Sequence, residues 1–336
     1  MNARARLAAA AAVLATALVT ALFVATAGAS PAAVLRALVE GSLLSTAALG
    51  ETLTRTTPIL LTGLGAVVAF RAGVLNIGLD GQLLAGAAAA AAAGAFLPAA
   101  SPASLRAATV VAALAAGALA TLPATWLFEK RNVPIVLSTI LLNLVASAHV
   151  SWLVRGPLRD PLGDYPQSPP LPESARLTAL LPGSRATGAV VVAFLLALAV
   201  WVLLSRTHAG LALRATGAAP TAARAAGLDD VAIRRRSFAL SGALAGLAGG
   251  LEVLAVTGRL YVPFSAGTGY TGIAAALLGL LHPAWTLVAS FSLAALAAGS
   301  GAMQRDCGVP ASLASVIPAV AVLAALAASS VRRRGP

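Results

Sequence analysis

The stretch PILLTGLGAVVAFRAGVLNIGLDGQ, residues 58–82, joins two apolar runs through a segment of glycines and polar side chains. Its glycines permit close backbone approach and positive φ angles. Its polar residues Asn76, Asp80 and Gln82 would be costly in contact with lipid, and such groups occur at membrane depth where protein or a water-filled cavity encloses them. We therefore expect membrane helices that break around an enclosed polar site.

The composition of the whole chain supports a membrane location. Of the 336 residues, 59% are hydrophobic and 10% are charged, whereas soluble domains carry about 25% charged residues. Apolar runs recur from end to end, so we expect one transmembrane domain over residues 1–336. The net charge of +12 is spread between these runs instead of clustering on a soluble face, which argues against nucleic-acid binding and for a lipid bilayer.

Ten apolar runs approach the length of about 20 residues that a spanning helix needs. The predicted fold is therefore all-α and polytopic, with about ten transmembrane helices (8–10), several of them short or broken. The runs at 58–70 and 271–281 are short and rich in glycine. The first run follows Arg4 and Arg6 and can be read either as an uncleaved helix, which we favour, or as a signal peptide. The ten runs cover residues 7–27, 58–70, 77–97, 103–128, 133–153, 188–204, 238–256, 271–281, 284–300 and 311–329.

The distribution of basic residues predicts the orientation. If both termini are cytoplasmic, most of the 23 Lys and Arg residues fall on the inner side, as the positive-inside rule requires. Residues 154–187, which hold seven prolines, then form an extracytoplasmic, irregular loop. Residues 205–236 form a cytoplasmic loop, whose centre from Gly217 to Gly227 reads as a short helix that ends at a glycine.

Polar residues within the apolar runs are the candidate site. Each set has two interpretations. Asp80 either faces a pathway or stabilises the positive end of a helix. Thr139 and Asn143 share a helix face and can bind a polar solute or join helices. Glu252 can face a pathway or form a hydrogen bond to a neighbouring helix.

Glycines at every fourth position mark the run that precedes Glu252. Gly242, Gly246 and Gly250 line one helix face, which permits close helix packing.

Catalytic and metal-binding patterns are absent from the sequence. The chain has one cysteine, Cys307, and its three histidines are far apart, so we expect no metal site. It has no phosphate-binding Walker loop, no Gly-x-Ser-x-Gly turn and no His-Glu-x-x-His pair. We expect neither an enzyme nor a bound cofactor, and an ATP-driven system would need its ATPase on another chain.

Several motifs resemble the ABC importer permeases of the branched-chain amino acid and simple sugar class. They include LTGLG at 61–65, Asn76-Ile-Gly78 and Asp80-Gly-Gln82. VLSTILLN at 136–143 resembles the nucleoside-uptake branch of that class. GLALRATGAAPTAARAAG at 210–227 resembles the cytoplasmic coupling loop, except that Ala219 stands where the family usually has Asn.

The resemblance implies the partners and the roles of the candidate residues. The importer would comprise two permease subunits, which are two copies of one chain or a related pair, two ABC ATPase subunits and an extracytoplasmic solute-binding protein at the plasma membrane. The ATPase would contact the loop through Gly217, Pro220, Ala222, Ala223 and Gly227. A nucleoside is the first candidate substrate and a simple sugar the second.

Two further expectations accompany this one. GLDG at 78–81 and GYTG at 269–272 each open an Ala- and Leu-rich helix, as the two halves of an inverted repeat would. The alternative function is an ion-coupled secondary transporter that uses Asp80 and Glu252. A membrane-embedded enzyme is a third reading, but the sequence offers it no catalytic constellation.

Overall fold

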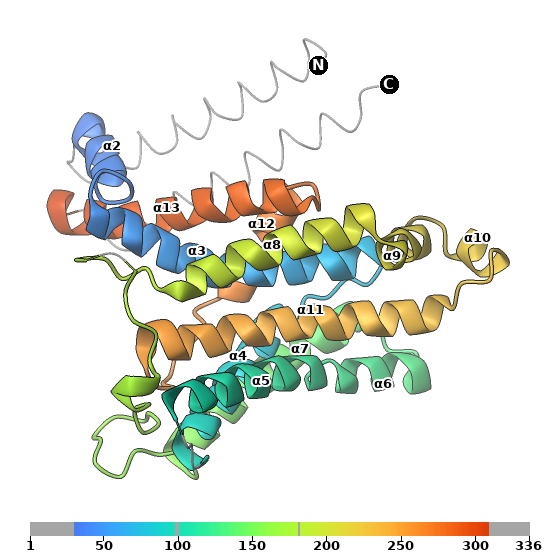
Figure 1. Cartoon of the computed structure of the whole chain (residues 1–336), viewed down its shortest axis with the longest axis horizontal. Helices are drawn as coiled ribbons and strands as arrows, with labels where there is room; N and C mark the ends of the chain where they lie inside the picture. The colour runs from blue at the N-terminus through green and yellow to red at the C-terminus, as the bar shows by residue number, and fades with distance from the viewer. Residues whose placement is uncertain (1–29, 98–100, 181, 309–336) are drawn as a thin grey trace. The chain divides into compact units, whose positions relative to one another are not determined.

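The structure, a computed structural model, describes residues 30–97, 101–180 and 182–308, and helices dominate these ranges (Figure 1). No β-strand occurs in them, so the all-α prediction is confirmed. The helices are α2 (Pro31–Glu40), α3 (Thr46–Arg71), α4 (Leu79–Phe96), α5 (Pro102–Leu119), α6 (Leu122–Arg131), α7 (Ile135–Arg155), α8 (Gly188–Arg206), α9 (His208–Ala218), α10 (Pro220–Ala225), α11 (Asp230–Glu252), α12 (Thr268–Leu278) and α13 (Pro283–Cys307), with a 3₁₀ turn η1 (Glu173–Ala175) and a π-helix η2 (Val253–Thr257).

Seven helices in the described ranges are long and apolar enough to cross a membrane. They are Thr46–Arg71, Leu79–Phe96, the α5–α6 pair Pro102–Arg131, Ile135–Arg155, Gly188–Arg206, Asp230–Thr257 and Pro283–Cys307. The predicted spans at 7–27 and 311–329 lie outside the described residues. The count of ten, the orientation of the termini and the inverted repeat therefore stay predictions.

The predicted short span at 58–70 is wrong, because it is the C-terminal half of the 26-residue helix α3. Pro58 lies inside this helix and removes one backbone hydrogen bond. Hydroxyl groups supply further hydrogen bonds to the helix backbone, since Thr54 Oγ1 donates to Gly50 O at 2.7 Å and Thr62 Oγ1 donates to Pro58 O at 2.7 Å. Both threonines are buried, so protein and not lipid surrounds this part of the helix.

The predicted short run at 271–281 does form a short apolar helix, but α12 covers Thr268–Leu278, so it lies three residues earlier and is not a candidate span. Its N-cap Gly267 has a φ of +84°, and the chain leaves the helix through Leu280 and Leu281, which also have positive φ. Such a helix is too short to cross a bilayer on its own.

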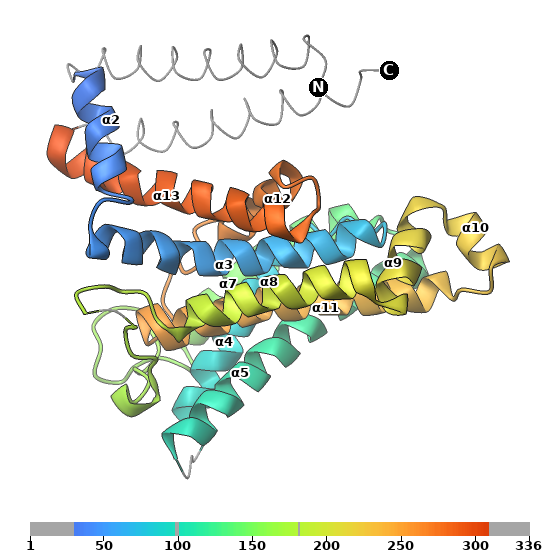
Figure 2. The same cartoon turned by 45° about the horizontal axis from the view of Figure 1, so that its top comes forward.

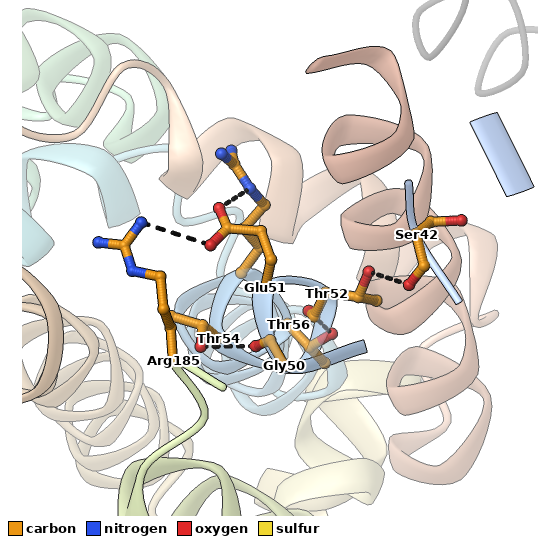
Figure 3. Close-up of polar contacts among 8 residues, drawn as sticks. Ser42, Gly50, Glu51, Thr52, Thr54, Thr56 and Arg185 are labelled. Carbon is orange, nitrogen blue, oxygen red and sulfur yellow. Dashed lines mark hydrogen bonds and ion pairs between the residues drawn. The ribbon is translucent and has the colours of Figure 1, made fainter. Parts of the chain in front are cut away.

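The chain folds into two compact units. The first contains α2, the start of α3, residues 180–186 and most of α13. Within it, Thr52 Oγ1 donates to Ser42 O at 2.8 Å, and Glu51 pairs with Arg185 at 3.4 Å and with Arg55 at 2.7 Å. Figure 3 shows Glu51 and Arg185 pointing toward each other. The ion pair joins Arg185 to the start of α3, and the Thr52 hydrogen bond joins the turn after α2 to it.

The second unit, Thr57–Ala179 with Thr187–Leu287, has its core where α11 lies beside α4 and α5 (Figures 1 and 2). The glycines of α11 lie at the crossings. A Cβ on Gly246 would be 2.3 Å from Ala113 O, one on Gly242 would be 2.3 Å from Gly117 O, and one on Gly250 would be 2.4 Å from Ala113 Cβ. Any side chain there would push α11 away from α5, so this row of glycines sets the helix spacing.

The Pro-rich segment at 154–187 is irregular, with one 3₁₀ turn. It binds the connection that follows α11 through backbone hydrogen bonds, among them Ser168 N to Leu260 O at 2.8 Å and Leu171 N to Gly258 O at 2.7 Å. Arg106 of α5 donates to the carbonyl oxygens of Ser174, Ala175 and Arg176. The segment is therefore ordered although it is rich in proline.

Candidate functional site: a polar cluster at the start of α4

A buried amide pair closes the connection between α3 and α4. Asn76 is fully buried and Gln82 is 3% exposed. Asn76 Nδ2 donates to Gln82 Oε1 at 2.8 Å and to Ser241 Oγ at 2.9 Å, while Asn76 Oδ1 accepts from Gly78 N at 2.9 Å and from Gln82 Nε2 at 3.2 Å. Because these bonds use both donors and the oxygen of Asn76, this side chain fixes the backbone turn that starts α4.

Asn143 of α7 joins three segments. Its Oδ1 accepts from Gly81 N at 2.8 Å, and its Nδ2 donates to Ile77 O at 3.0 Å and to Tyr270 Oη at 2.8 Å. Asn143 is 5% exposed, whereas Tyr270 is 44% exposed. The amide therefore connects the first turn of α4 to a tyrosine of α12 that reaches the surface of the chain.

Asp80, in the first turn of α4, connects that helix to α12. Its Oδ1 accepts from Ser265 Oγ and from Gly269 N, the latter at 2.9 Å. A Cβ on Gly269 would lie 2.3 Å from Asp80 N, so the two helix starts are in direct backbone contact. The carboxylate thus lies beside the N-terminal turns of two helices, where backbone N–H groups favour negative charge.

The cluster contains four of the six predicted pathway residues. Asn76, Asp80, Gln82 and Asn143 lie in it. Thr139 lies beside it, since a Cβ on Gly78 would be 3.0 Å from Thr139 Cβ, but its hydroxyl donates to Ile135 O of its own helix at 2.8 Å.

Glu252 is not part of the cluster. It ends α11, eleven residues after Ser241, which is roughly 16 Å along a helix axis. The π-helix that follows it, Val253–Thr257, is a local irregularity of a kind that recurs at functional sites.

Three members of the cluster were missed by sequence reasoning: Ser241, Ser265 and Tyr270. Their partners are 165, 185 and 127 residues away along the chain. Tyr270 lies in GYTG at 269–272, which the sequence analysis identified as a helix start. That motif is the signal by which Tyr270 could have been found.

The segment predicted to couple to an ATPase contains two helices. Pro220 has no N–H and disfavours helical angles in the residue before it, and Ala219 is accordingly not helical (φ −147°, ψ 81°). The predicted short helix that ends at Gly227 is confirmed as α10, but it begins at Pro220 and not at Gly217, which belongs to α9. Gly217 is the penultimate residue of α9. The helix α10 covers Pro220–Ala225, and Gly227 after it has a φ of +82°.

Gly217 connects this segment to the polar cluster. A Cβ there would lie 2.1 Å from Arg71 O, at the end of α3. Arg71 Nε in turn donates to Leu281 O at 3.0 Å, three residues after α12. The end of α9 therefore touches the segment that leads directly into Asn76 and Asp80.

Most of α10 is exposed. Thr221, Ala222, Arg224 and Ala225 are exposed and only Ala223 is buried. The described part of the chain therefore leaves most of this short helix uncovered. No group of three or more His, Cys, Asp or Glu residues in the described ranges could hold a metal ion.

Seven helices that are long and apolar enough to cross a membrane indicate a polytopic membrane protein, and comparison with known proteins assigns its class. The chain belongs to the family described as branched-chain amino acid transport system/permease component, which matches residues 48–326. It is accordingly a multi-pass plasma-membrane protein and a permease subunit of an ABC transporter. Such subunits work, in general, with an ATPase and a solute-binding protein.

Three relatives illustrate the family. The glucose ABC transporter permease of Haloferax volcanii is 32% identical over 84% of this chain and 77% of its own length. The guanosine ABC transporter permease of Bacillus subtilis is 31% identical over 84% of this chain and 82% of its own. A nucleoside ABC transporter permease of Lactococcus lactis is 28% identical over 81% of this chain and 88% of its own. No solved structure gives a significant match.

Proposed function

We propose that this chain translocates a nucleoside, with a simple sugar as the second candidate, by alternating access that a separate ATPase subunit drives. Two of the three relatives described above are permeases of guanosine or nucleoside ABC transporters. VLSTILLN at 136–143 also resembles the nucleoside-uptake branch, and both observations support the nucleoside.

We place the substrate pathway beside the polar cluster. The hydrogen bonds of Asn76, Gln82 and Asn143 are made within the protein, which suits residues that hold the pathway in shape. Asp80 and Tyr270 are the members that keep some exposure, and they suit contact with a solute: a carboxylate accepts hydrogen bonds from ribose hydroxyls, and an aromatic ring can stack on a base. Thr139 and Glu252 would extend the pathway on either side of this point.

The coupling mechanism rests on one observation, the contact between Gly217 and the end of α3. In this mechanism the ATPase binds the exposed face of α10, at Pro220, Ala222 and Gly227, and its closure moves α9. Because Gly217 lies directly against Arg71, the movement reaches the α3–α4 connection and, through the hydrogen bond of Arg71 to Leu281, the end of α12. Both helices that meet at Asp80 are then displaced together.

The remaining parts of the importer follow from this arrangement. ATP would be hydrolysed on the partner subunit, and this chain would bind no cofactor. A second permease subunit, identical or related, would complete the pathway, with the loop at 154–187 on the extracytoplasmic side where the solute-binding protein delivers substrate.

Energy coupling in whole cells tests the proposal against the ion-coupled alternative. Uptake of radiolabelled guanosine by cells that express the complete transporter should stop when ATP is depleted at constant ion gradients. It should continue when an ionophore collapses the gradients while ATP is maintained. The opposite pattern would assign the transport to an ion-coupled carrier that uses Asp80 and Glu252.

A further inference from the structure

A pocket of about 380 Å³ opens where α6, α7 and α11 meet the α3–α4 connection. Its volume lies within the range of about 300–1,000 Å³ that is usual for small-molecule sites. Apolar side chains form most of its wall, among them Leu75, Phe128, Ile135, Val136, Val231 and Phe238. The pocket is separate from the polar cluster, whose residues do not line it.

Two acidic and two basic side chains line the pocket, and Arg234 is the one of the four without an ion pair in the described residues. Arg235 binds both carboxylate oxygens of Glu129, and Asp230 Oδ1 lies 3.8 Å from Arg224 Nε. Arg234 also lines the pocket, but it forms no ion pair within the described part of the chain, and its Nε is buried without a hydrogen-bond partner there. A buried donor without a partner is destabilising, so an anion that accepts a hydrogen bond from Arg234 Nε would be stabilising.

The surroundings of the pocket are those of a membrane interface. It lies at the ends of three candidate membrane spans. Leu75, Phe128 and Val231 on its wall are 54%, 43% and 49% exposed. On the same helix as Phe128, Trp126 is 53% exposed, and the guanidinium of Arg131 lies 5.8 Å from its ring centroid. Tryptophan and basic residues concentrate at the level of lipid headgroups.

We propose that this pocket binds one anionic phospholipid, with its phosphodiester on Arg234 and the start of an acyl chain against Phe128, Val231 and Phe238. A small soluble anion would neutralise Arg234 but would leave the exposed apolar wall in water. An anionic lipid would pair with Arg234 and also cover the apolar wall. Basic pockets between transmembrane helices do bind anionic headgroups. The proposal requires only that the chain spans a membrane, so it does not depend on the transported solute.

Native mass spectrometry of the full-length protein, purified in detergent with equal amounts of phosphatidylglycerol and phosphatidylcholine, tests the proposal. The wild type should retain one phosphatidylglycerol in preference to phosphatidylcholine. Arg234→Gln should lower that preference about fivefold, which corresponds to about 1 kcal/mol for one basic residue near an anionic surface. Arg234→Lys, which keeps the charge, should retain most of the preference.

The neighbouring residue supplies a matched control. Arg236 is exposed and does not line the pocket, so Arg236→Gln should change the preference less than twofold. Equal losses in Arg234→Gln and Arg236→Gln, or no loss in either, would overturn the proposal.

A second experiment does not depend on the folding of an arginine variant. A photo-crosslinking amino acid in place of Val136 should form adducts with lipid in native membranes. Adducts with a protein, either the ATPase or a second permease subunit, would mean that a partner covers the pocket, and the proposal would then be wrong.

Discussion

Replacement of Gly217 by alanine is the sharpest test of how movement reaches the polar cluster. The added Cβ would lie 2.1 Å from Arg71 O, 2.8 Å from Arg71 C and 3.0 Å from Ala72 C. Real Cβ atoms essentially never approach another atom more closely than 3.0 Å. All three atoms are backbone, and Ala72 is fully buried, so α9 has to move away from α3 by roughly 1 Å, a step of the size that overpacking imposes.

The size of the effect follows from this displacement. Overpacking of a close contact costs about 1–3 kcal/mol, and we expect the coupling between α9 and the α3–α4 connection to weaken by a free energy of that order. We expect the number of solute molecules imported per ATP hydrolysed to fall about tenfold, which corresponds to about 1.4 kcal/mol. Membrane insertion should be unchanged, because the contact lies at the end of a helix and not within the α4–α5–α11 core.

The assay measures uptake and ATP hydrolysis in the same proteoliposomes, which contain the permease with its ATPase and solute-binding protein. Gly188→Ala is the matched control, because a Cβ at Gly188 would meet nothing within 4 Å and its φ is not positive. If Gly217→Ala imports as many molecules per ATP as the wild type and the control, the contact does not transmit the movement and the reasoning fails.

Substitutions at three further positions test backbone strain and hydrogen bonding. Gly227→Ala meets no atom within 4 Å but keeps a φ of +82°, so it should cost about 1–2 kcal/mol of local backbone strain and reduce uptake per ATP less than Gly217→Ala; a larger reduction would show that the tight contact is not the critical one. Asn143→Leu removes the acceptor of Gly81 N–H, which costs about 1–3 kcal/mol; the melting temperature in detergent should fall by several degrees, and an unchanged value would exclude a structural role. Asp80→Asn keeps an acceptor oxygen for Gly269 N–H, so its melting temperature should fall less than that of Asp80→Ala, and equal falls would contradict the hydrogen bonds described above.

Features that depend on local sequence were predictable. The composition and the apolar runs indicate membrane helices, and GLDG at 78–81 and GYTG at 269–272 mark the starts of α4 and α12. The glycines of α11 repeat every four residues, and α5 lies against that face. Each of these signals lies within a few residues of the structure that it forms.

Features that depend on tertiary context were missed. The apolar run was predicted to begin at Pro58, yet α3 begins twelve residues earlier, at Thr46, and continues through the proline in a part of the helix that protein surrounds. Helical periodicity places Thr139 and Asn143 on one face but does not say what that face meets. In the structure Asn143 donates a hydrogen bond to Tyr270, 127 residues away, whereas Thr139 donates to Ile135 O of its own helix. Periodicity could not distinguish these two outcomes.

The coupling segment has one feature that local sequence predicts and one that depends on tertiary context. Pro220 was visible in the sequence, and its effect on Ala219 explains why the expected helix divides into α9 and α10. The contact of Gly217 with the end of α3 could not be predicted, because a glycine gives no sign of the backbone that approaches it.

The most direct test of the central claim is ATP hydrolysis by the reconstituted importer with and without nucleoside. This chain is purified with its ATPase, second permease subunit and solute-binding protein and placed in lipid vesicles. We expect guanosine to stimulate hydrolysis and to accumulate in the vesicles. An assembled complex whose hydrolysis responds to glucose and not to guanosine would contradict the nucleoside assignment, and vesicles that accumulate solute without ATP would contradict the ATP-driven mechanism itself.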